Sequence, residues 1–255
     1  MNKKLKKSQT QRKLLFANSY VGFEITKYLL HNFFKDICGI VTTSKNNIYN
    51  LAYKANKKVF IYKDNVDFLK KLPQNIDLGL LIWWPFIIKK PLLDIPKNGF
   101  LNTHPSFLPY NKGKNPNFWA IVDNNPFGVT IHKIDRGIDT GPIISQKEIH
   151  YDWRDTGESL YKKSLIEMIK LFKRIYPKIR LQILNSIAQK KISSFHFKKD
   201  MDLISKIDLD KKYRAKELFN LLRARTFNSY PSCFFEDNGK KYEVRIKITK
   251  KLNKL

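Results

Sequence analysis

Short apolar runs alternate with amphipathic stretches over the first 160 residues of the chain. The apolar runs have the length of buried strands. The stretches between them repeat apolar residues every three or four positions, as a helix packed on one face does. Strands are expected at 14–17, 37–42, 58–62, 78–83, 99–104, 128–134 and 143–149, and helices at 22–34, 46–55, 64–71, from 118 onward and 159–176. This alternation predicts an α/β fold, a Rossmann-like, mostly parallel twisted sheet flanked by helices.

The pattern changes after the long helix, which is expected to end near Pro177. A further helical stretch is expected to reach about residue 188, and the polar segment 189–213 then leads into a small appendage. The appendage is predicted to contain a helix at 215–224 and a β-hairpin with strands at 233–236 and 242–248. The sequence thus predicts a main domain over 1–188, with 1–11 flexible, and a C-terminal appendage over 189–255.

Chemically distinctive residues gather at the ends of two predicted strands. Asn102 and His104 lie two positions apart at the end of the strand at 99–104, so both side chains point to one face. This is the edge at which open α/β sheets place their sites. The next strand leads into the loop 135–142, where Asp139 lies between glycines that permit tight turns. An amide, an imidazole and a carboxylate are therefore predicted to face one crevice.

These segments resemble a known enzyme family. Residues 102–109 read Asn-Thr-His-Pro-Ser-Phe-Leu-Pro, and 128–132 (Gly-Val-Thr-Ile-His) and 135–141 (Asp-Arg-Gly-Ile-Asp-Thr-Gly) follow. Their order and spacing are similar to those of the folate-dependent formyltransferases, over roughly residues 12–250. The resemblance implies that Asn102, His104 and Asp139 are the catalytic residues and that 10-formyltetrahydrofolate is the formyl donor.

The resemblance also implies where the folate binds. The loop after the strand at 78–83 is aromatic and apolar, which suits a flat heterocycle, and in the resembling enzymes this loop helps to hold the pterin. The expected cofactor-binding residues are Phe86, Ile87, Ile88, Lys89, Asp135 and Gly137. The alternative for residues 86–89 is a hydrophobic connection that packs on the following short helix.

A polar, basic loop at 110–117 follows the strand with Asn102 and ends near the start of a helix. Lysines beside a glycine and a helix N-terminus form a surface suited to phosphates. Arginines in the appendage are suited to a diphosphate. The substrate-binding candidates are Tyr110, Lys112, Lys114, Asn115, Arg223, Arg225 and Tyr230. The alternatives are an ordinary solvated loop and arginines that pack their helix on the main domain.

The length of the appendage bears on which formyltransferases the chain is most similar to. It exceeds that of glycinamide ribonucleotide transformylases and falls short of the barrel domain of methionyl-tRNA formyltransferases. It looks like the C-terminal part of the sugar N-formyltransferases. The resemblance thus implies formyl transfer to the amine of a dTDP- or UDP-linked amino sugar, for surface polysaccharide (lipopolysaccharide) biosynthesis. Methionyl-tRNA and glycinamide ribonucleotide formyltransferase activities are the alternatives.

The formal charge of +27 leaves a non-enzymatic alternative open, a basic module that binds nucleic acid. The lysines, however, are scattered in pairs along the whole chain rather than gathered in one block. We therefore expect small-molecule partners, a reduced folate and a nucleotide-linked amino sugar, and disfavour nucleic acid. A homodimer is left open.

Other features restrict the functional class. The turn at 18–22 lacks a G-x-G-x-x-G motif, so a nicotinamide cofactor is not expected. The histidines lack the local spacing of a zinc site, so no metal is expected, and His132 is interpreted as a structural strand residue. Cys38 and Cys233 lie far apart, and no apolar run approaches the roughly 20 residues that cross a bilayer. A cytoplasmic protein without membrane insertion is expected.

The candidate trio of Asn102, His104 and Asp139 implies a mechanism. An amine that attacks the formyl carbon builds negative charge on the formyl oxygen, where the Asn102 amide and a protonated His104 would stabilise it. Asp139 is expected to keep His104 charged and to relay the proton that leaves the amine.

Overall fold

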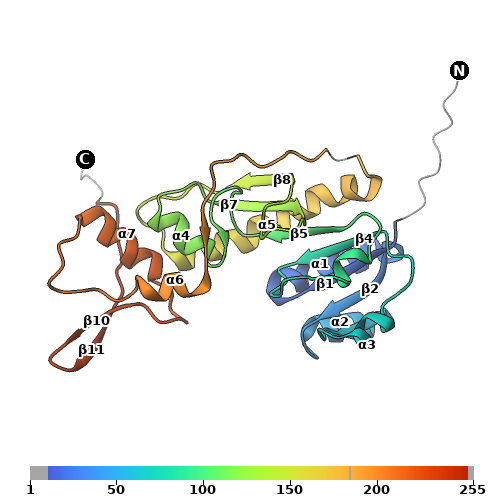
Figure 1. Ribbon diagram of the computed structural model, residues 1–255, viewed down its shortest axis with the longest axis horizontal. Coiled ribbons are helices and arrows are strands. Elements are labelled where there is room, and N and C mark those ends of the chain that lie inside the picture. The colour runs from blue at the N-terminus through green and yellow to red at the C-terminus, as the bar shows by residue number, and fades with distance from the viewer. Residues whose placement is uncertain (1–10, 184, 252–255) are drawn as a thin grey trace, which may run out of the picture.

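The computed structural model describes residues 11–183 and 185–251 (Figure 1). Its central sheet has seven strands in the order β3-β2-β1-β4-β5-β7-β8. These strands are β1 (Lys13–Ala17), β2 (Ile37–Thr42), β3 (Val59–Ile61), β4 (Leu78–Ile82), β5 (Phe100–His104), β7 (Gly128–Lys133) and β8 (Ile143–Glu148). The flexible extension expected at 1–11 lies outside the described residues up to residue 10, and Gln11 is buried.

The first five strands in this order run parallel, whereas β7 pairs antiparallel with β5, and β8 antiparallel with β7. The helices around the sheet are α1 (Ser19–Asn32), α2 (Asn47–Lys54), α3 (Val66–Lys71), α4 (Pro116–Val122) and α5 (Gly157–Leu181). The predicted mostly parallel, Rossmann-like sheet flanked by helices is therefore confirmed.

Alternation along the strands builds an apolar layer on each face of the sheet. In β1, Leu15 and Ala17 belong to one buried cluster with residues of α1, α4 and α5. Leu14 and Phe16 belong to a second cluster, which includes Phe68 of α3. Because both faces are covered, the central strands are continuous apolar runs in the sequence.

The 25-residue helix α5 continues through Pro177, where the sequence predicted its end. A proline removes one helical N–H and leaves the carbonyl four residues earlier without its donor. The hydroxyl of Tyr28 in α1 donates to this carbonyl, Lys173 O, at 3.3 Å. The further helix expected to reach residue 188 is wrong for the described residues, because the chain turns at Gln182 in a left-handed conformation (φ +57°). None of the described helices, α5 included, is long and apolar enough to cross a membrane.

The C-terminal part contains α6 (Lys198–Leu203), α7 (Ala215–Arg225) and a hairpin of β10 (Cys233–Asp237) and β11 (Lys240–Val244). The predicted helix and hairpin are confirmed, and α7 packs against α4. Between α5 and α6 the chain runs back along the sheet in extended form (Figure 1). Part of it, β9 (Phe195–His196), pairs in parallel with β6 (Lys112–Gly113), so this segment contacts the main domain. The domain boundary at 188/189 stays a prediction.

A buried ionic network ties α5 to the amino ends of β1 and β2. Asp36, which is 1% exposed, accepts hydrogen bonds from Tyr176 (3.0 Å) and Arg180 (2.9 and 3.1 Å). Lys13 of β1 is fully buried, with its Nζ 3.7 Å from the same carboxylate. Burial lowers the pKa of Lys13 and outweighs the opposing effect of Asp36. The Asp36 carboxylate thus holds three elements together.

We predict that Asp36→Asn lowers the free energy of unfolding by about 3–5 kcal/mol, because Lys13 and Arg180 lose their buried counter-charge. Urea unfolding followed by circular dichroism measures this change. Asp94→Asn is the matched control, since Asp94 lies in an exposed pair with Lys90, and such pairs contribute about 0–1 kcal/mol. Equally small effects of the two substitutions would contradict the role of Asp36.

Candidate active site

Asn102 and His104 lie at the carboxyl end of β5, and the loop after β7 brings Asp139 to them. His104 Nδ1 is 3.5 Å from Asp139 Oδ2, and Asn102 Nδ2 is 3.5 Å from Asp139 Oδ1. His104 is 6% exposed and the Asp139 side chain 12%. The structure therefore brings together the three side chains that the sequence placed in one crevice.

A fourth polar side chain, His132 of β7, completes the cluster. In the antiparallel pairing of β5 with β7, His132 lies directly opposite Asn102. Its Nδ1 is 2.8 Å from the carbonyl oxygen of Lys133, which only accepts, so Nδ1 carries the proton. His132 Nε2 then accepts the N–H of Asn102 at 3.2 Å and lies 3.6 Å from Asp139 Oδ1. The interpretation of His132 as an ordinary strand residue missed these contacts.

The site favours the charged form of Asp139 and the neutral form of His104. Burial alone would raise the pKa of Asp139, but His104, His132 and the backbone N–H of Gly113 outweigh burial and hold that pKa well below its ordinary value of 3.8. The pKa of His104 is lowered from 6.5, chiefly by burial and against the effect of Asp139. The resting pair is therefore an ionised carboxylate beside a neutral imidazole. This differs from the protonated His104 expected from the sequence, because the sequence pattern does not report how completely the ring is buried.

The loop 111–114 supplies backbone partners for both groups. His104 Nε2 is 3.3 Å from Asn111 O, and Gly113 N donates to Asp139 Oδ2 at 3.0 Å. Both ring nitrogens of His104 thus face acceptors, so the ring is better paired once it gains a second proton. A neutral imidazole in these surroundings is suited to accept a proton from a bound substrate. In residues 11–183 and 185–251, no group of three or more His, Cys, Asp or Glu side chains is arranged to hold a metal ion.

The predicted substrate residues of the basic loop lie next to this cluster but differ in exposure. Lys112 is 8% exposed, whereas Lys114 is exposed and lowers the pKa of His104. Asn115 directly precedes α4 in a left-handed conformation (φ +55°), and its amide nitrogen is buried without a hydrogen-bond partner in the described part of the chain. Tyr110 is half-buried. The loop is packed against the site, so the alternative of an ordinary solvated loop is wrong.

The predicted folate loop follows β4 and divides into exposed and buried residues. Phe86 and Ile87 are 49% and 64% exposed, and Lys89 is also exposed, whereas Ile88 is buried. Phe86 stacks on Tyr62 with ring centroids 5.4 Å apart. Ile88 thus packs inward, as the alternative expected, whereas Phe86 and Ile87 are exposed. A contact of residues 86–89 with folate stays a prediction.

Asp135 and Gly137, the other two predicted folate residues, are exposed and hydrogen-bonded within their own loop. Asp135 Oδ1 accepts from Gly137 N at 3.0 Å and from Thr140 Oγ1 at 2.6 Å. These bonds shape the turn that carries Asp139. A contact of Asp135 or Gly137 with folate stays a prediction.

The three candidates of the C-terminal part lie in two different environments. Arg223 is 4% exposed, and its Nη1 donates to the carbonyl oxygens of Asp152 and Asp155 at 2.8 and 2.9 Å. Arg225 is 8% exposed, and its side chain bonds that of Asp202 at 2.9 Å. Both arginines therefore pack α7 on its neighbours, which was the alternative to diphosphate binding. Tyr230 is 60% exposed and open to a ligand.

Comparison with known proteins places the fold and this cluster in one family. Residues 35–174, more than half of the chain, match the family described as "Formyl transferase". The chain belongs to the formyl transferase family. Residues 200–250 match the "N-formyltransferase dimerization C-terminal domain". Asn102, His104, His132 and Asp139 all lie within the first match.

Two curated relatives and one solved structure illustrate the range of this formyl transferase family. The dTDP-4-amino-4,6-dideoxyglucose formyltransferase of Mycobacterium bovis is 32% identical over 147 residues, 57% of this chain and 63% of the relative. The methionyl-tRNA formyltransferase of Agathobacter rectalis is 30% identical over 181 residues, 71% of this chain and 56% of the relative. The crystal structure of a sugar 3N-formyl transferase in the presence of dTDP and 5-N-formyl-THF has a TM-score of 0.72 and 26% identity, covering 92% of this chain and 85% of that one. The chain spans less than two thirds of the length of either curated relative.

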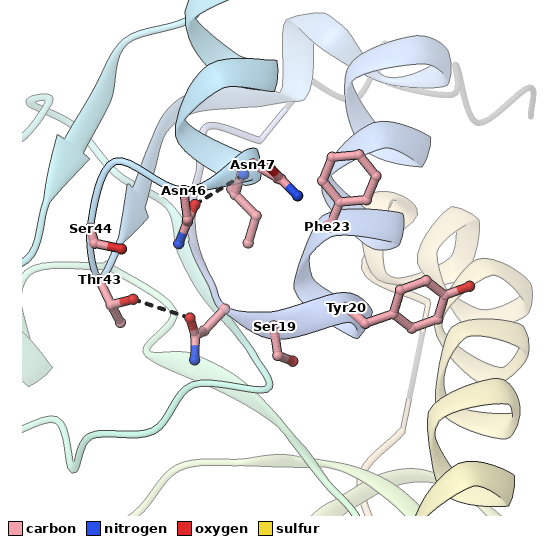
Figure 2. Close-up of a pocket in the computed structure, with 9 residues that line it drawn as sticks. Ser19, Tyr20, Phe23, Thr43, Ser44, Asn46 and Asn47 are labelled. Carbon is pink, nitrogen blue, oxygen red and sulfur yellow. Dashed lines mark hydrogen bonds between the residues drawn. The ribbon is translucent and has the colours of Figure 1, made fainter.

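A pocket of about 480 Å³ opens at the carboxyl ends of β1 and β2 (Figure 2). Thr43 Oγ1 donates to Asn18 Oδ1 at 3.1 Å across the pocket, and Asn46 caps α2 beside it. Since β1, β4 and β5 are successive strands about 4.8 Å apart, the pocket lies roughly 10 Å along the same sheet edge from β5. Its lining residues carry no formal charge: Asn18, Ser19, Tyr20, Phe23, Thr43, Ser44, Asn46, Asn47 and Ile48.

We predict that the pKa of His104 lies below 6.5 in the wild-type protein and falls further in Asp139→Asn, because the carboxylate that raises it is lost. Two-bond ¹H–¹⁵N NMR of the histidine rings as a function of pH measures both values. Asp135→Asn, in the same loop, keeps an acceptor oxygen and should leave the His104 titration unchanged. A higher pKa of His104 in Asp139→Asn would show that the pairing is not electrostatic.

Proposed function

We propose that the protein is an N-formyltransferase that moves a formyl group from 10-formyltetrahydrofolate to the amine of a dTDP- or UDP-linked amino sugar. The observation that carries the proposal is the cluster of the buried His104 with the partly buried Asn102 and Asp139, inside the region that matches the formyl transferase family. The match of residues 200–250 to an N-formyltransferase C-terminal domain supports the amine acceptor. The names of the Mycobacterium relative and of the solved sugar 3N-formyl transferase support the nucleotide-linked sugar.

The residues after β4 fit a folate. Phe86 and Ile87 are exposed, and the Phe86 ring lies beside the rings of Tyr62 and Trp84, so a flat pterin can stack there without unfolding the loop. The bound folate supplies the electrophilic formyl carbon. We assign Lys89, together with Asp135 and Gly137 at the neighbouring turn, to the same ligand.

Asn102, His104 and Asp139 each have a separate role in the acyl transfer. His104, neutral at rest, accepts the proton that the attacking amine loses as its nitrogen bonds the formyl carbon. The imidazolium would then return this proton to the folate nitrogen that leaves as its bond to the formyl carbon breaks, so that the formamide and tetrahydrofolate result. Asp139 stays ionised and stabilises the resulting imidazolium. Asn102 donates one N–H to His132, whereas its other N–H makes only a long contact of 3.5 Å with Asp139. This second N–H is the donor available to the formyl oxygen as negative charge develops there.

An aromatic row leads from the edge of the sheet to the C-terminal part. Trp83, directly after β4, meets Tyr161 of α5 with ring centroids 6.5 Å apart. Tyr161 meets Phe227 at 5.6 Å, and Phe227 meets Tyr230 at 4.8 Å. Because Tyr230 is exposed, it offers a ring on which a nucleobase can stack. The positive charge of Lys114 beside the trio suits the phosphates of the same acceptor.

We further propose that the protein works as a homodimer in the cytoplasm. Residues 200–250 match a dimerization domain, and large apolar side chains of that part are exposed: Leu203 (72%), Leu209 (56%), Phe219 (48%) and Tyr242 (44%). Both cysteines are free thiols, which supports a reducing compartment. A monomer in sedimentation velocity at micromolar concentration would argue against the dimer.

We expect the purified protein, given 10-formyltetrahydrofolate, to formylate at least one dTDP- or UDP-linked amino sugar and to leave methionyl-tRNA and glycinamide ribonucleotide unchanged. Mass spectrometry of each acceptor detects the added formyl group. Calorimetric titration with dTDP and UDP tests the nucleotide part of the acceptor separately. Efficient formylation of methionyl-tRNA with every amino sugar inert would overturn the proposal in favour of the tRNA alternative.

Asn102→Ala, His104→Ala and Asp139→Asn are each expected to lower kcat by on the order of a hundredfold or more, because each removes a group that acts on the developing charge or on the transferred proton. Steady-state kinetics measures the loss, and circular dichroism checks the fold. His150→Ala is the control, since that side chain is 91% exposed. If His104→Ala kept a large share of wild-type kcat, the mechanism would be wrong.

A further inference from the structure

The extended segment 185–197, which we call the strap, runs from the end of α5 back along the sheet to α6 (Figure 1). It is bound to the main domain at several points along its length. Ile187 exchanges two backbone hydrogen bonds with Ile143 at the start of β8. Gln189 bonds the loop that carries Asp139, and Ser194 bonds the loop 111–114.

The side chain of Gln189 spans the turn that carries Asp139. Its Nε2 donates both N–H groups, one to Asp139 O and one to Gly141 O, each at 2.8 Å. Its Oε1 is buried, and no described residue donates a hydrogen bond to it. The amide therefore acts here through its two donors alone.

The turn has a backbone conformation that needs outside support. Asp139 has a φ of +55°, in the left-handed region that few residues other than glycine adopt readily. The chain also passes so close to β7 that a Cβ at Gly141 would clash with Lys133 O. One planar amide fixes the carbonyl oxygens on both sides of Thr140. Gln189 thereby fixes the position of the Asp139 backbone, from which the carboxylate side chain projects.

The C-terminal end of the strap also supports the Asp139 carboxylate, through its hydrogen bonds to the loop 111–114. Ser194 Oγ accepts the N–H of Asn111 at 2.8 Å, and Asn111 O faces His104. The pairing of β9 with β6 holds Gly113, whose N–H donates to Asp139 Oδ2 at 3.0 Å. The strap thus fixes the backbone on both sides of the pair formed by His104 and Asp139.

We propose that Gln189 is a positioning residue for formyl transfer: by fixing the turn at Asp139 it sets the distance between the Asp139 carboxylate and His104. This role rests on the proposed function. Gln189 acts through Asp139 and is therefore distinct from the catalytic trio.

Gln189→Met removes both donors and keeps the approximate length of the side chain. We expect kcat to fall roughly tenfold to a hundredfold, since displacement of a reacting group by about 1 Å costs on this scale. KM for both substrates should stay within about twofold, because no substrate contact is lost. Tm should fall by no more than about 5 °C.

The titration of His104 gives a readout that needs no substrate. With Asp139 displaced, His104 loses the carboxylate that raises its pKa, while His132 and Lys114, which lower it, remain. ¹⁵N NMR of Gln189→Met should therefore show a lower pKa of His104 than in the wild type. A purely structural role would lower Tm or the folded fraction and leave this titration unchanged.

Gln74→Met makes the same change at an exposed glutamine, and it should match the wild type in kcat and in the His104 titration. If Gln189→Met fails to fold, Gln189→Asn replaces it, because its amide is one methylene too short to reach both carbonyls. Unchanged kcat and an unchanged His104 titration in the folded variant overturn the proposal. If the wild type formylates no acceptor, the proposed function fails, and the His104 titration then decides the role of Gln189.

Discussion

A carboxylate that stays ionised inside the protein is the constraint on which the rest of the candidate site depends. Removing Asp139 from water disfavours its charge, and the charge persists because the His104 ring, the Asn102 amide, which His132 holds in place, and the backbone N–H of Gly113 face it. These partners come from β5, from β7 and from the loop 111–114. The sheet brings the first two together by strand pairing, and the strap holds the loop in place.

Asp36 and Asp139 lie at opposite ends of the strands, and the partner of each carboxylate determines its role: one stabilises the fold and the other is suited to proton transfer. Asp36, near the amino ends of β1 and β2, is bound by Arg180, which stays charged at any physiological pH. That pair is a fixed link between α5 and the sheet. Asp139, near the carboxyl end of β5, is paired with His104, an imidazole that can gain and lose a proton. That pair is suited to hold and release a proton.

The sequence predicted correctly those features that depend on residues close together in the chain. All seven strands of the sheet occur where apolar runs placed them, and Asn102 and His104 share a face because their spacing of two allows nothing else in a strand. Features that depend on residues far apart in the sequence were not predicted. Helix α5 passes Pro177, and the carbonyl that the proline leaves without its helical donor is satisfied by Tyr28, which lies 145 residues earlier in the chain.

In the candidate site, too, the contacts that the sequence did not predict are those between residues far apart in the chain. His132 joins the cluster through the antiparallel register of β7 on β5, which no pattern within either strand reveals. Gln189 lies in a polar segment without periodicity, so nothing in its neighbourhood distinguishes it from a solvated residue. Arg223 was expected to be able to reach a diphosphate, and its burial against the carbonyls of residues 152 and 155 follows only from the packing of α7.

The central claim is that His104 receives the proton of the attacking amine while Asn102 donates to the formyl oxygen. A crystal structure with a dTDP- or UDP-linked amino sugar and a 5-formyl folate, which holds the formyl group without transferring it, tests this claim most directly. The account predicts the sugar amine within about 2.6–3.2 Å of a His104 ring nitrogen, directly or through one water, and the formyl oxygen at a similar distance from Asn102 Nδ2. Both ligands bound in order with the amine directed away from His104 would contradict it.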